Sequence, residues 1–211
     1  IFGFTPFDVA VGDINNDGFD DIAIGARRNQ DGGSNNGQVF LFFGNRSDFG
    51  KDMDLDSANA SFIGNNGEWL TESLSGPGDV NGDGYDDVIV GALGYADPYP
   101  SEEYEGAAFV FHGSGSGLSS AADWSYESDT ANAEYGVSVC AAGDLNGDGY
   151  DDVAIGAWRF NNKGKVYVHY GASGGLSTTP DWTKTSDQGT DADSCSEYGV
   201  AVSTAGDVNG D

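Results

Sequence analysis

The chain of 211 residues carries 35 acidic against 8 basic side chains, which gives a formal charge of -27. Such a negative surface repels phosphate backbones and anionic lipid, so we expect no nucleic-acid partner and favour cationic partners such as metal ions. With 34 Gly, 26 aromatic residues and 5 Pro, the composition favours strands and turns over long helices or a disordered tail. No apolar run approaches the ~18 residues of a membrane span, so we expect no membrane insertion. A start Met and a signal sequence are also missing, which is typical of a mature product or an excised fragment.

An acidic string recurs in chain order. It reads GDINNDGFDDIAIGA from Gly12, GDVNGDGYDDVIVGA from Gly78, GDLNGDGYDDVAIGA from Gly143 and GDVNGD from Gly206, where the fourth copy stops with the sequence. Its first Asp stands at 13, 79, 144 and 207, so the copies are 66, 65 and 63 residues apart. Self-similarity at a fixed period is the sequence signature of a repeat architecture.

Each repeat predicts four short strands. The first precedes the acidic string, and the second follows it directly, at 22–24, 88–90 and 153–155. The second strands are apolar at every position, so we expect both of their faces to be buried. The third is an aromatic run bounded by Gly, at 37–44, 106–113 and 164–171, and the fourth lies near Phe62, after Asp123 and after Asp181. Polar connections at 27–36, 94–105 and 159–163 predict surface loops.

A four-stranded antiparallel sheet that recurs at this period and cannot cover its own faces is the pattern of a β-propeller blade. We therefore interpret residues 1–211 as one all-β, partial propeller of about three blades and the start of a fourth. Seven blades at this period would need roughly 450 residues, so the chain is too short to close such a ring. It is expected to be part of a larger propeller, or to complete its ring by self-association through open blade edges.

The acidic string has the spacing of a cation-binding loop. Oxygen-bearing side chains stand at positions 1, 3, 5 and 9, Gly stands at position 6, and a main-chain carbonyl is available at position 7. Three complete calcium sites and a fourth, truncated one are predicted. The candidate ligands are Asp13, Asn15, Asp17, Phe19 and Asp21; Asp79, Asn81, Asp83, Tyr85 and Asp87; Asp144, Asn146, Asp148, Tyr150 and Asp152; and Asp207, Asn209 and Asp211.

Other readings of the loop fit less well. Magnesium keeps its waters, and zinc would want His or Cys, which the loops lack. An EF-hand is excluded because Ile24, Val90 and Ile155 stand where a bidentate Glu is needed. Simple hairpin turns with solvated acids remain as the alternative, but a turn does not need several acids in fixed phase.

These features resemble the FG-GAP repeats of integrin α-subunit-like β-propellers. The resemblance is carried by EYG at Tyr135 and Tyr198, the DxNxDGxxD loops, IGA or VGA at Gly25, Gly91 and Gly156, and the Gly-bounded aromatic runs. It implies a seven-bladed propeller with calcium between the first two strands of a blade, on the face opposite the usual ligand-binding loops. GAR, GAL and GAW replace GAP, and the first and second units have FGFTPF and EWLTESL where the FG dipeptide would stand before the loop. These departures favour a secreted bacterial or archaeal member of the family.

Three readings of the function fit this resemblance. The favoured one is a calcium-binding, extracellular or cell-surface module for adhesion, in which calcium makes the loops rigid and variable loops on the opposite face bind a protein or glycan. The alternative is an accessory or catalytic propeller of a secreted hydrolase or lyase, and a self-assembling surface or filament component is a third reading. We favour the non-enzymatic reading because no acid–base constellation stands outside the acidic loops.

Several residues with reactive side chains have simpler explanations. His112 and His169 fall in adjacent registers of the aromatic runs and so point to opposite sheet faces, which argues against one catalytic pair and favours ordinary strand positions. Ser173 matches a GxSxG elbow, but a strand there leads into a loop and not into a helix. Cys140 and Cys195 allow either a bridge between blades or two separate thiols.

Two sequons and four Trp residues complete the candidates; the Trp residues that could stack on sugars are Trp69, Trp124, Trp158 and Trp182. Asn45 and Asn59 fit the glycosylation pattern, which matters only in a host that glycosylates secreted proteins. Trp124 and Trp182 recur in phase, so we expect them to pack, whereas Trp158 stands in a loop and is predicted to be exposed.

Overall fold

The computed structural model describes residues 8–27, 36–45, 58–64, 70–95, 104–188 and 196–206. These residues form three four-stranded antiparallel sheets, one for each repeat, and the neighbouring strands in each sheet are consecutive in the chain. The three sheets are the three predicted blades, so the expectation of an all-β partial propeller is confirmed.

The strand bounds follow the repeat. In the first blade they are β1 Asp8–Gly12, β2 Asp21–Ala26, β3 Gln38–Phe42 and β4 Ala60–Ile63. In the second blade they are β5 Leu70–Gly78, β6 Asp87–Ala92, β7 Ala107–Phe111 and β8 Trp124–Glu127. In the third blade they are β9 Tyr135–Gly143, β10 Asp152–Ala157, β11 Lys165–His169 and β12 Trp182–Thr185, with a short 3₁₀ turn at Phe160–Asn162 between β10 and β11.

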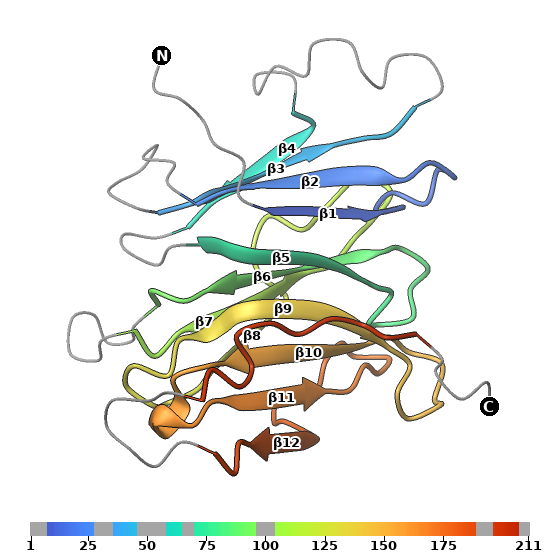
Figure 1. The fold of residues 1–211 in the computed structure, drawn as a ribbon. Coiled ribbons are helices and arrows are strands. Elements are labelled where there is room, and N and C mark those ends of the chain that lie inside the picture. Colours follow the sequence, from blue (N-terminus) through green and yellow to red (C-terminus); the bar gives the residue numbers. More distant parts are fainter. Residues whose placement is uncertain are drawn as a thin grey trace.

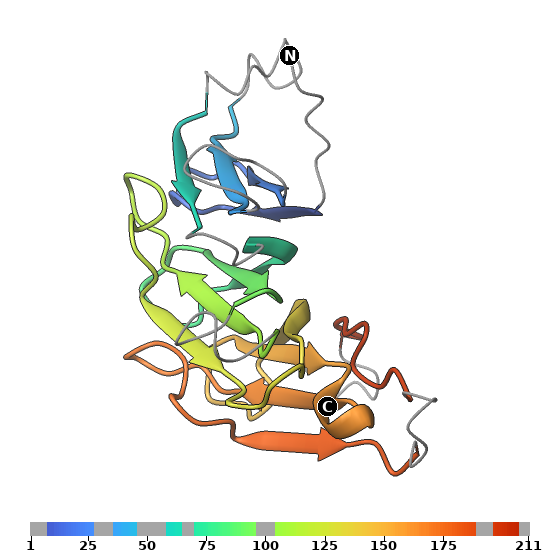
Figure 2. The same ribbon diagram turned by 90° about the vertical axis from the view of Figure 1, so that its left-hand side faces the viewer.

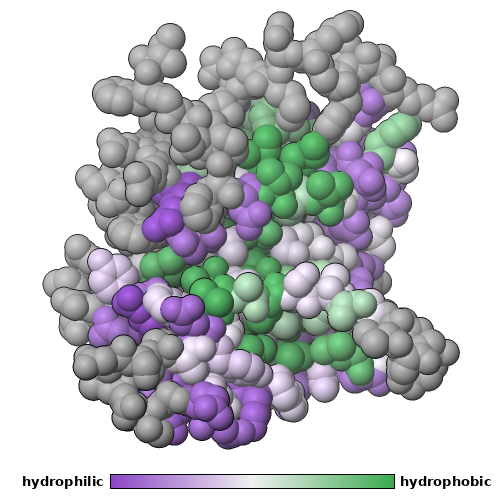
Figure 3. Space-filling model, viewed as in Figure 1, coloured by the Kyte–Doolittle hydropathy of each residue, from purple (hydrophilic) through white to green (hydrophobic). Residues whose placement is uncertain are grey.

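The sheets stack in chain order, and the stack is curved (Figures 1 and 2). The first strands line the concave side, where β5 contacts both β1 and β9, as neighbouring innermost strands of a propeller do. Apolar side chains gather on this face (Figure 3). Among the described residues, no helix is long and apolar enough to cross a membrane.

The core lies between the blades rather than within them, because a single sheet cannot cover both of its own faces. Leu41 of the first blade packs with Val90 and Phe111 of the second. Between the second and third blades, Val110 packs with Ile155. Each blade interface therefore buries apolar surface contributed by two repeats.

The second strand of each blade was predicted to be buried on both faces. This prediction holds for β6 and is partly wrong for β2 and β10. All six residues of β6 are buried, because this blade has a neighbour on each side. Ile22 and Ile24 in β2 and Ala154 in β10 are half-buried. They lie on faces that are turned away from the middle blade, where the described residues supply no further sheet.

The start of a fourth unit lies against the third blade. Val202 donates its N–H to Ser138 Oγ at 3.0 Å, as Ala141 of the third blade donates to Ser75 Oγ at 3.2 Å one blade earlier. Tyr198 forms an isolated bridge with Gly164, but residues 199–206 form no strand. The segment from Glu197 therefore occupies the place of a first strand without a described partner strand.

The Trp residues show what a neighbouring blade does. Trp124 is buried, as predicted, but Trp182 at the equivalent place is 48% exposed, because no fourth sheet among the described residues covers it. The prediction for Trp158 is also wrong: it is half-buried, and its Nε1 donates to Glu134 Oε2 at 2.6 Å while the Arg159 guanidinium lies 4.5 Å from the ring centroid.

Candidate metal centres

The three complete acidic loops lie at the same edge of the stack, where they join β1 to β2, β5 to β6 and β9 to β10 (right in Figure 1). We call them the first (13–21), second (79–87) and third (144–152) acidic loops. The predicted ligands of the fourth copy, at 207, 209 and 211, lie outside the described residues.

In the second loop, the first acidic side chain is turned into the loop. Asp79 Oδ1 accepts the N–H groups of Gly82 and Asp83 at 2.6 and 3.1 Å, and Oδ2 accepts the N–H of Gly84 at 2.7 Å. Asn81 Oδ1 accepts the N–H of Asp83 at 2.8 Å, and Asp83 Oδ1 accepts that of Tyr85 at 3.0 Å. The side chains at positions 1, 3 and 5 thus all accept N–H groups of their own loop.

The same hydrogen bonds recur in the other two loops. Asp144 Oδ2 accepts the N–H of Gly149 at 2.8 Å, and Asp13 Oδ2 accepts that of Gly18 at 2.9 Å. The turn needs a left-handed backbone at position 4, where Asn16 replaces the Gly of the other copies with a φ of 53°. The loop geometry is therefore a property of the repeated string and not of one copy.

The ninth position ties each loop to its sheet, which sequence reasoning did not predict. Asp87 is fully buried; its Oδ2 accepts the N–H of Val80 and its Oδ1 the N–H of Gly113, both at 2.9 Å. Asp152 is equally buried and accepts N–H groups from Leu145 and Gly171. A signal was present in the sequence, because the Gly that ends each aromatic run recurs in phase with this Asp.

In the first loop this pattern is incomplete. Asp21 is fully buried, and its Oδ1 accepts the N–H of Gly44 at 2.8 Å. No hydrogen bond from the described residues reaches its buried Oδ2. A buried carboxylate oxygen without a donor is costly unless a positive charge lies nearby. An all-oxygen donor set of carboxylates, an amide and a carbonyl fits a hard cation such as calcium.

The loop carboxylates nevertheless do not converge in this structure. Within the described ranges, no three His, Cys, Asp or Glu side chains are grouped so that they could hold a metal ion together. The oxygens at positions 1, 3 and 5 instead accept N–H groups of their own loops, as in Asp79, Asn81 and Asp83.

Burial and mutual repulsion oppose the charge of these carboxylates. Burial, together with the nearby carboxylates of Asp79 and Asp83, raises the pKa of Asp87 to about 7, although two N–H donors act in the opposite direction. Burial likewise raises the pKa of Asp21 and Asp152. By contrast, hydrogen bonds from Gly149 and its neighbours lower the pKa of the exposed Asp144. Added positive charge at the loops would therefore favour the ionised form of their buried members.

The other candidate residues have structural roles. His169 is fully buried, and its Nε2 lies 3.3 Å from the Tyr135 hydroxyl, whereas His112 is half-buried beside Asp123, with 3.9 Å between Nδ1 and Oδ2. Ser173 is exposed in a loop after β11, with no helix following it among the described residues, so the elbow motif is accidental.

The modification candidates are only partly described. Cys140 is a buried free thiol whose pKa is raised by burial, and Cys195 lies outside the described residues. Asn45 and Asn59 are both exposed, and Asn59 Oδ1 accepts the N–H of Phe43 at 2.9 Å.

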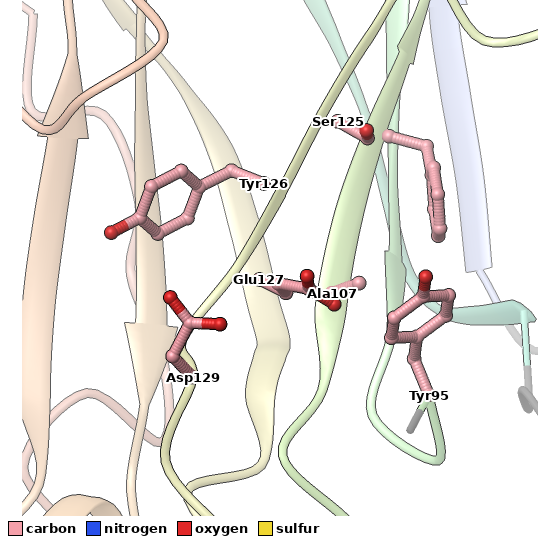
Figure 4. Close-up of a pocket in the computed structure, with 7 residues that line it drawn as sticks. Tyr95, Ala107, Ser125, Tyr126, Glu127 and Asp129 are labelled. Carbon is pink, nitrogen blue, oxygen red and sulfur yellow. The ribbon is translucent and has the colours of Figure 1, made fainter. Parts of the chain in front are cut away.

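A pocket of about 260 Å³ opens at the other end of the second blade. Tyr95 and Tyr126 lie on opposite sides of it, with Glu127 between them (Figure 4). Tyr95 makes an edge-on contact with Phe109, 5.7 Å between ring centroids, and both rings also line a neighbouring hollow of about 310 Å³. Tyr95 follows the end of β6 and the second acidic loop precedes its start, so the pocket and the loop lie at opposite ends of this strand.

The chain is similar to known repeat proteins. A family model described as FG-GAP repeat matches residues 5–42, 73–111 and 135–169, which cover the first three strands of each blade except the start of β5. Integrin alpha pat-2 of Caenorhabditis briggsae is 34% identical over 175 residues, covering 73% of this chain and 13% of that protein. Integrin alpha-8 of Gallus gallus is 30% identical over 177 residues, covering 80% of this chain and 15% of that protein. The chain thus spans only a small part of the length of these relatives.

Proposed function

Because this chain belongs to the FG-GAP repeat family, we propose that it is a calcium-binding, extracellular β-propeller module for adhesion, without enzymatic activity of its own. The adhesion role and the location outside the cell are proposed by analogy with the integrin alpha relatives. The calcium sites are proposed from the acidic loops themselves.

The observation that carries the calcium proposal is the carboxylate of Asp21. It is fully buried beneath the first acidic loop, and one of its oxygens accepts no hydrogen bond of normal geometry from the described residues, although the Asn15 N–H lies near the carboxylate. Asp13 and Asp17 repel it from the same loop. A bound calcium ion would supply the positive charge that offsets this burial and repulsion. The equivalent ligand sets, each with a carbonyl at position 7, lie in the second and third loops.

The loop residues would act by holding oxygens ready around the turn. Hydrogen bonds from loop N–H groups already orient the carboxylate at position 1, as Gly82, Asp83 and Gly84 do for Asp79. A ligand set that is ordered in advance loses less conformational entropy on binding. Rigid loops at this edge would in turn hold neighbouring blades in a fixed relation.

Recognition is proposed for the opposite end of the blades. The pocket between Tyr95 and Tyr126 offers aromatic rings together with the carboxylates of Glu127 and Asp129. Aromatic faces and polar groups of this kind suit either a protein side chain or a sugar ring. We therefore propose a protein or glycan ligand at this end, away from the calcium loops.

Removal of calcium tests the proposal. At a free calcium concentration 100 times the dissociation constant of a site, binding at that site adds about 2.7 kcal/mol to the free energy of unfolding. EGTA is therefore expected to lower the melting temperature markedly, and calcium but not an equal concentration of magnesium is expected to restore it. Asp148→Ala should weaken one site and leave the others. A melting temperature that EGTA does not change would refute calcium binding.

A further inference from the structure

The eighth residue of each acidic loop is an Asp that stands outside the candidate ligand set. In two of the loops it reaches the preceding blade. Asp86 Oδ2 accepts the N–H of Asp13 at 2.8 Å, and the Asp86 N–H donates to the Asp13 carbonyl at 3.3 Å. Asp151 holds Asp79 in the same way, at 3.1 and 3.2 Å. Asp86 and Asp151 thus each fix both main-chain polar groups of the first residue in the loop before their own.

The main chain beside this contact leaves room for it. A Cβ added to Gly12 would lie 2.7 Å from Asp86 Oδ2, and one added to Gly78 would lie 2.2 Å from Asp151 Oδ2. Real Cβ atoms do not approach other atoms so closely, so any side chain at either Gly would displace the carboxylate. The Gly-Asp pair that opens the acidic string therefore accommodates the carboxylate of the following blade.

We propose that the eighth Asp is a positioning residue for the calcium site of the preceding blade, and not for the site in its own loop. This inference rests on the proposed calcium function. The first Asp of a loop can present its carboxylate to an ion only in the direction that its main chain allows. Asp86 fixes that main chain at Asp13, so the first site is ordered by a residue 73 positions away. Loss of the contact would leave ion binding to supply the ordering.

The chain contains its own matched control. Asp20 occupies the eighth position of the first loop, where the described residues provide no preceding blade, and it is exposed, whereas Asp86 and Asp151 are half-buried. All three carry the same charge beside the same kind of loop. Removing Asp20 therefore removes the charge without removing a contact between blades.

A calcium titration of the whole chain, monitored by NMR, measures the calcium affinity of each site separately. The N–H groups of Gly18, Gly84 and Gly149 each donate to the first Asp of their own loop, so each signal reports one site. In Asp86→Ala we expect half-saturation of the Gly18 signal to need about tenfold more calcium, because a tenfold change in affinity corresponds to the loss of about one hydrogen bond to a charged group. At Gly84 we expect less than about a twofold change. In Asp20→Ala we expect less than about a twofold change at Gly18.

Two further variants separate positioning from charge and from loss of folding. Asp86→Asn keeps an oxygen that can accept the Asp13 N–H, so it should bind within about threefold of the wild type at Gly18. If Asp86→Ala does not fold, Asp151→Ala gives the same test one blade later, with the loss expected at Gly84.

The outcomes are distinct. Three results would overturn the positioning role alone, in a protein that does bind calcium. They are a weaker calcium affinity at the variant's own loop, an equally weakened affinity in Asp86→Asn and Asp86→Ala, and an unchanged affinity in every variant. A wild type in which calcium moves none of the three Gly signals overturns the calcium function and this inference together.

Discussion

Replacing Gly78 with Ala tests the contact between the second and third blades at a single atom. Gly78 has a φ of +84°, and an added Cβ would lie 2.2 Å from Asp151 Oδ2. Gly143 occupies the same place in the next repeat with a φ of +70°, but no described atom lies within 4 Å of its added Cβ. The pair therefore separates the cost of a left-handed Ala from the cost of the contact.

The expected magnitudes follow from these two geometries. A left-handed Ala costs about 1–2 kcal/mol, and this is the whole expectation for Gly143→Ala. In Gly78→Ala the Asp151 carboxylate must also move away from the Asp79 N–H, which adds about 1.5–3 kcal/mol for a hydrogen bond to a charged group. Gly78→Ala should therefore lower the free energy of unfolding by about 2 kcal/mol more than Gly143→Ala.

Urea unfolding in excess EGTA measures the difference without a contribution from bound metal. In the double variant Gly78→Ala/Asp151→Ala, the clash is already relieved, so the added cost of Gly78→Ala should fall to that of Gly143→Ala. Equal destabilisation by the two single Ala variants, or full additivity in the double variant, would refute the contact between the blades.

Two other predictions concern buried polar groups. Burial raises the pKa of Glu72 to about 7; the Arg27 guanidinium opposes this shift and the Glu134 carboxylate adds to it. The folded state therefore holds a proton that the unfolded state loses near pH 4.5. The free energy of unfolding should fall by about 1–2 kcal/mol as the pH rises from 5 to 8, and melting curves of Glu72→Gln in EGTA should lack this part of the slope. His169 Nδ1 lies 3.0 Å from a carbonyl and must donate to it, so Nε2 accepts from the Tyr135 hydroxyl. Tyr135→Phe should cost about 1–2 kcal/mol in urea unfolding, and a loss below about 0.5 kcal/mol would contradict this bond.

The sequence alone determined the repeat, the blades and the positions of the strands. The period of the acidic string and the Gly-bounded aromatic runs are local patterns, and strand formation follows from local alternation and turn residues. The same local information placed the oxygens of positions 1, 3 and 5 in one turn, as in Asp79, Asn81 and Asp83, because a Gly-containing loop of nine residues has few ways to fold. Calcium binding by these loops stays a prediction.

Only the tertiary structure decided what the eighth and ninth residues do. Asp87 accepts the N–H of Gly113, just beyond the third strand, and Asp86 accepts an N–H from the loop of the preceding blade. The string around Asp20 reads like the strings around Asp86 and Asp151, yet Asp20 is exposed and the other two hold a neighbouring loop. A residue's own repeat cannot encode this difference, because it depends on whether another blade stands beside it. For the same reason the excess of Asp was recognisable from composition, while the division of these residues between bonds within a loop and bonds between blades required the stacked blades.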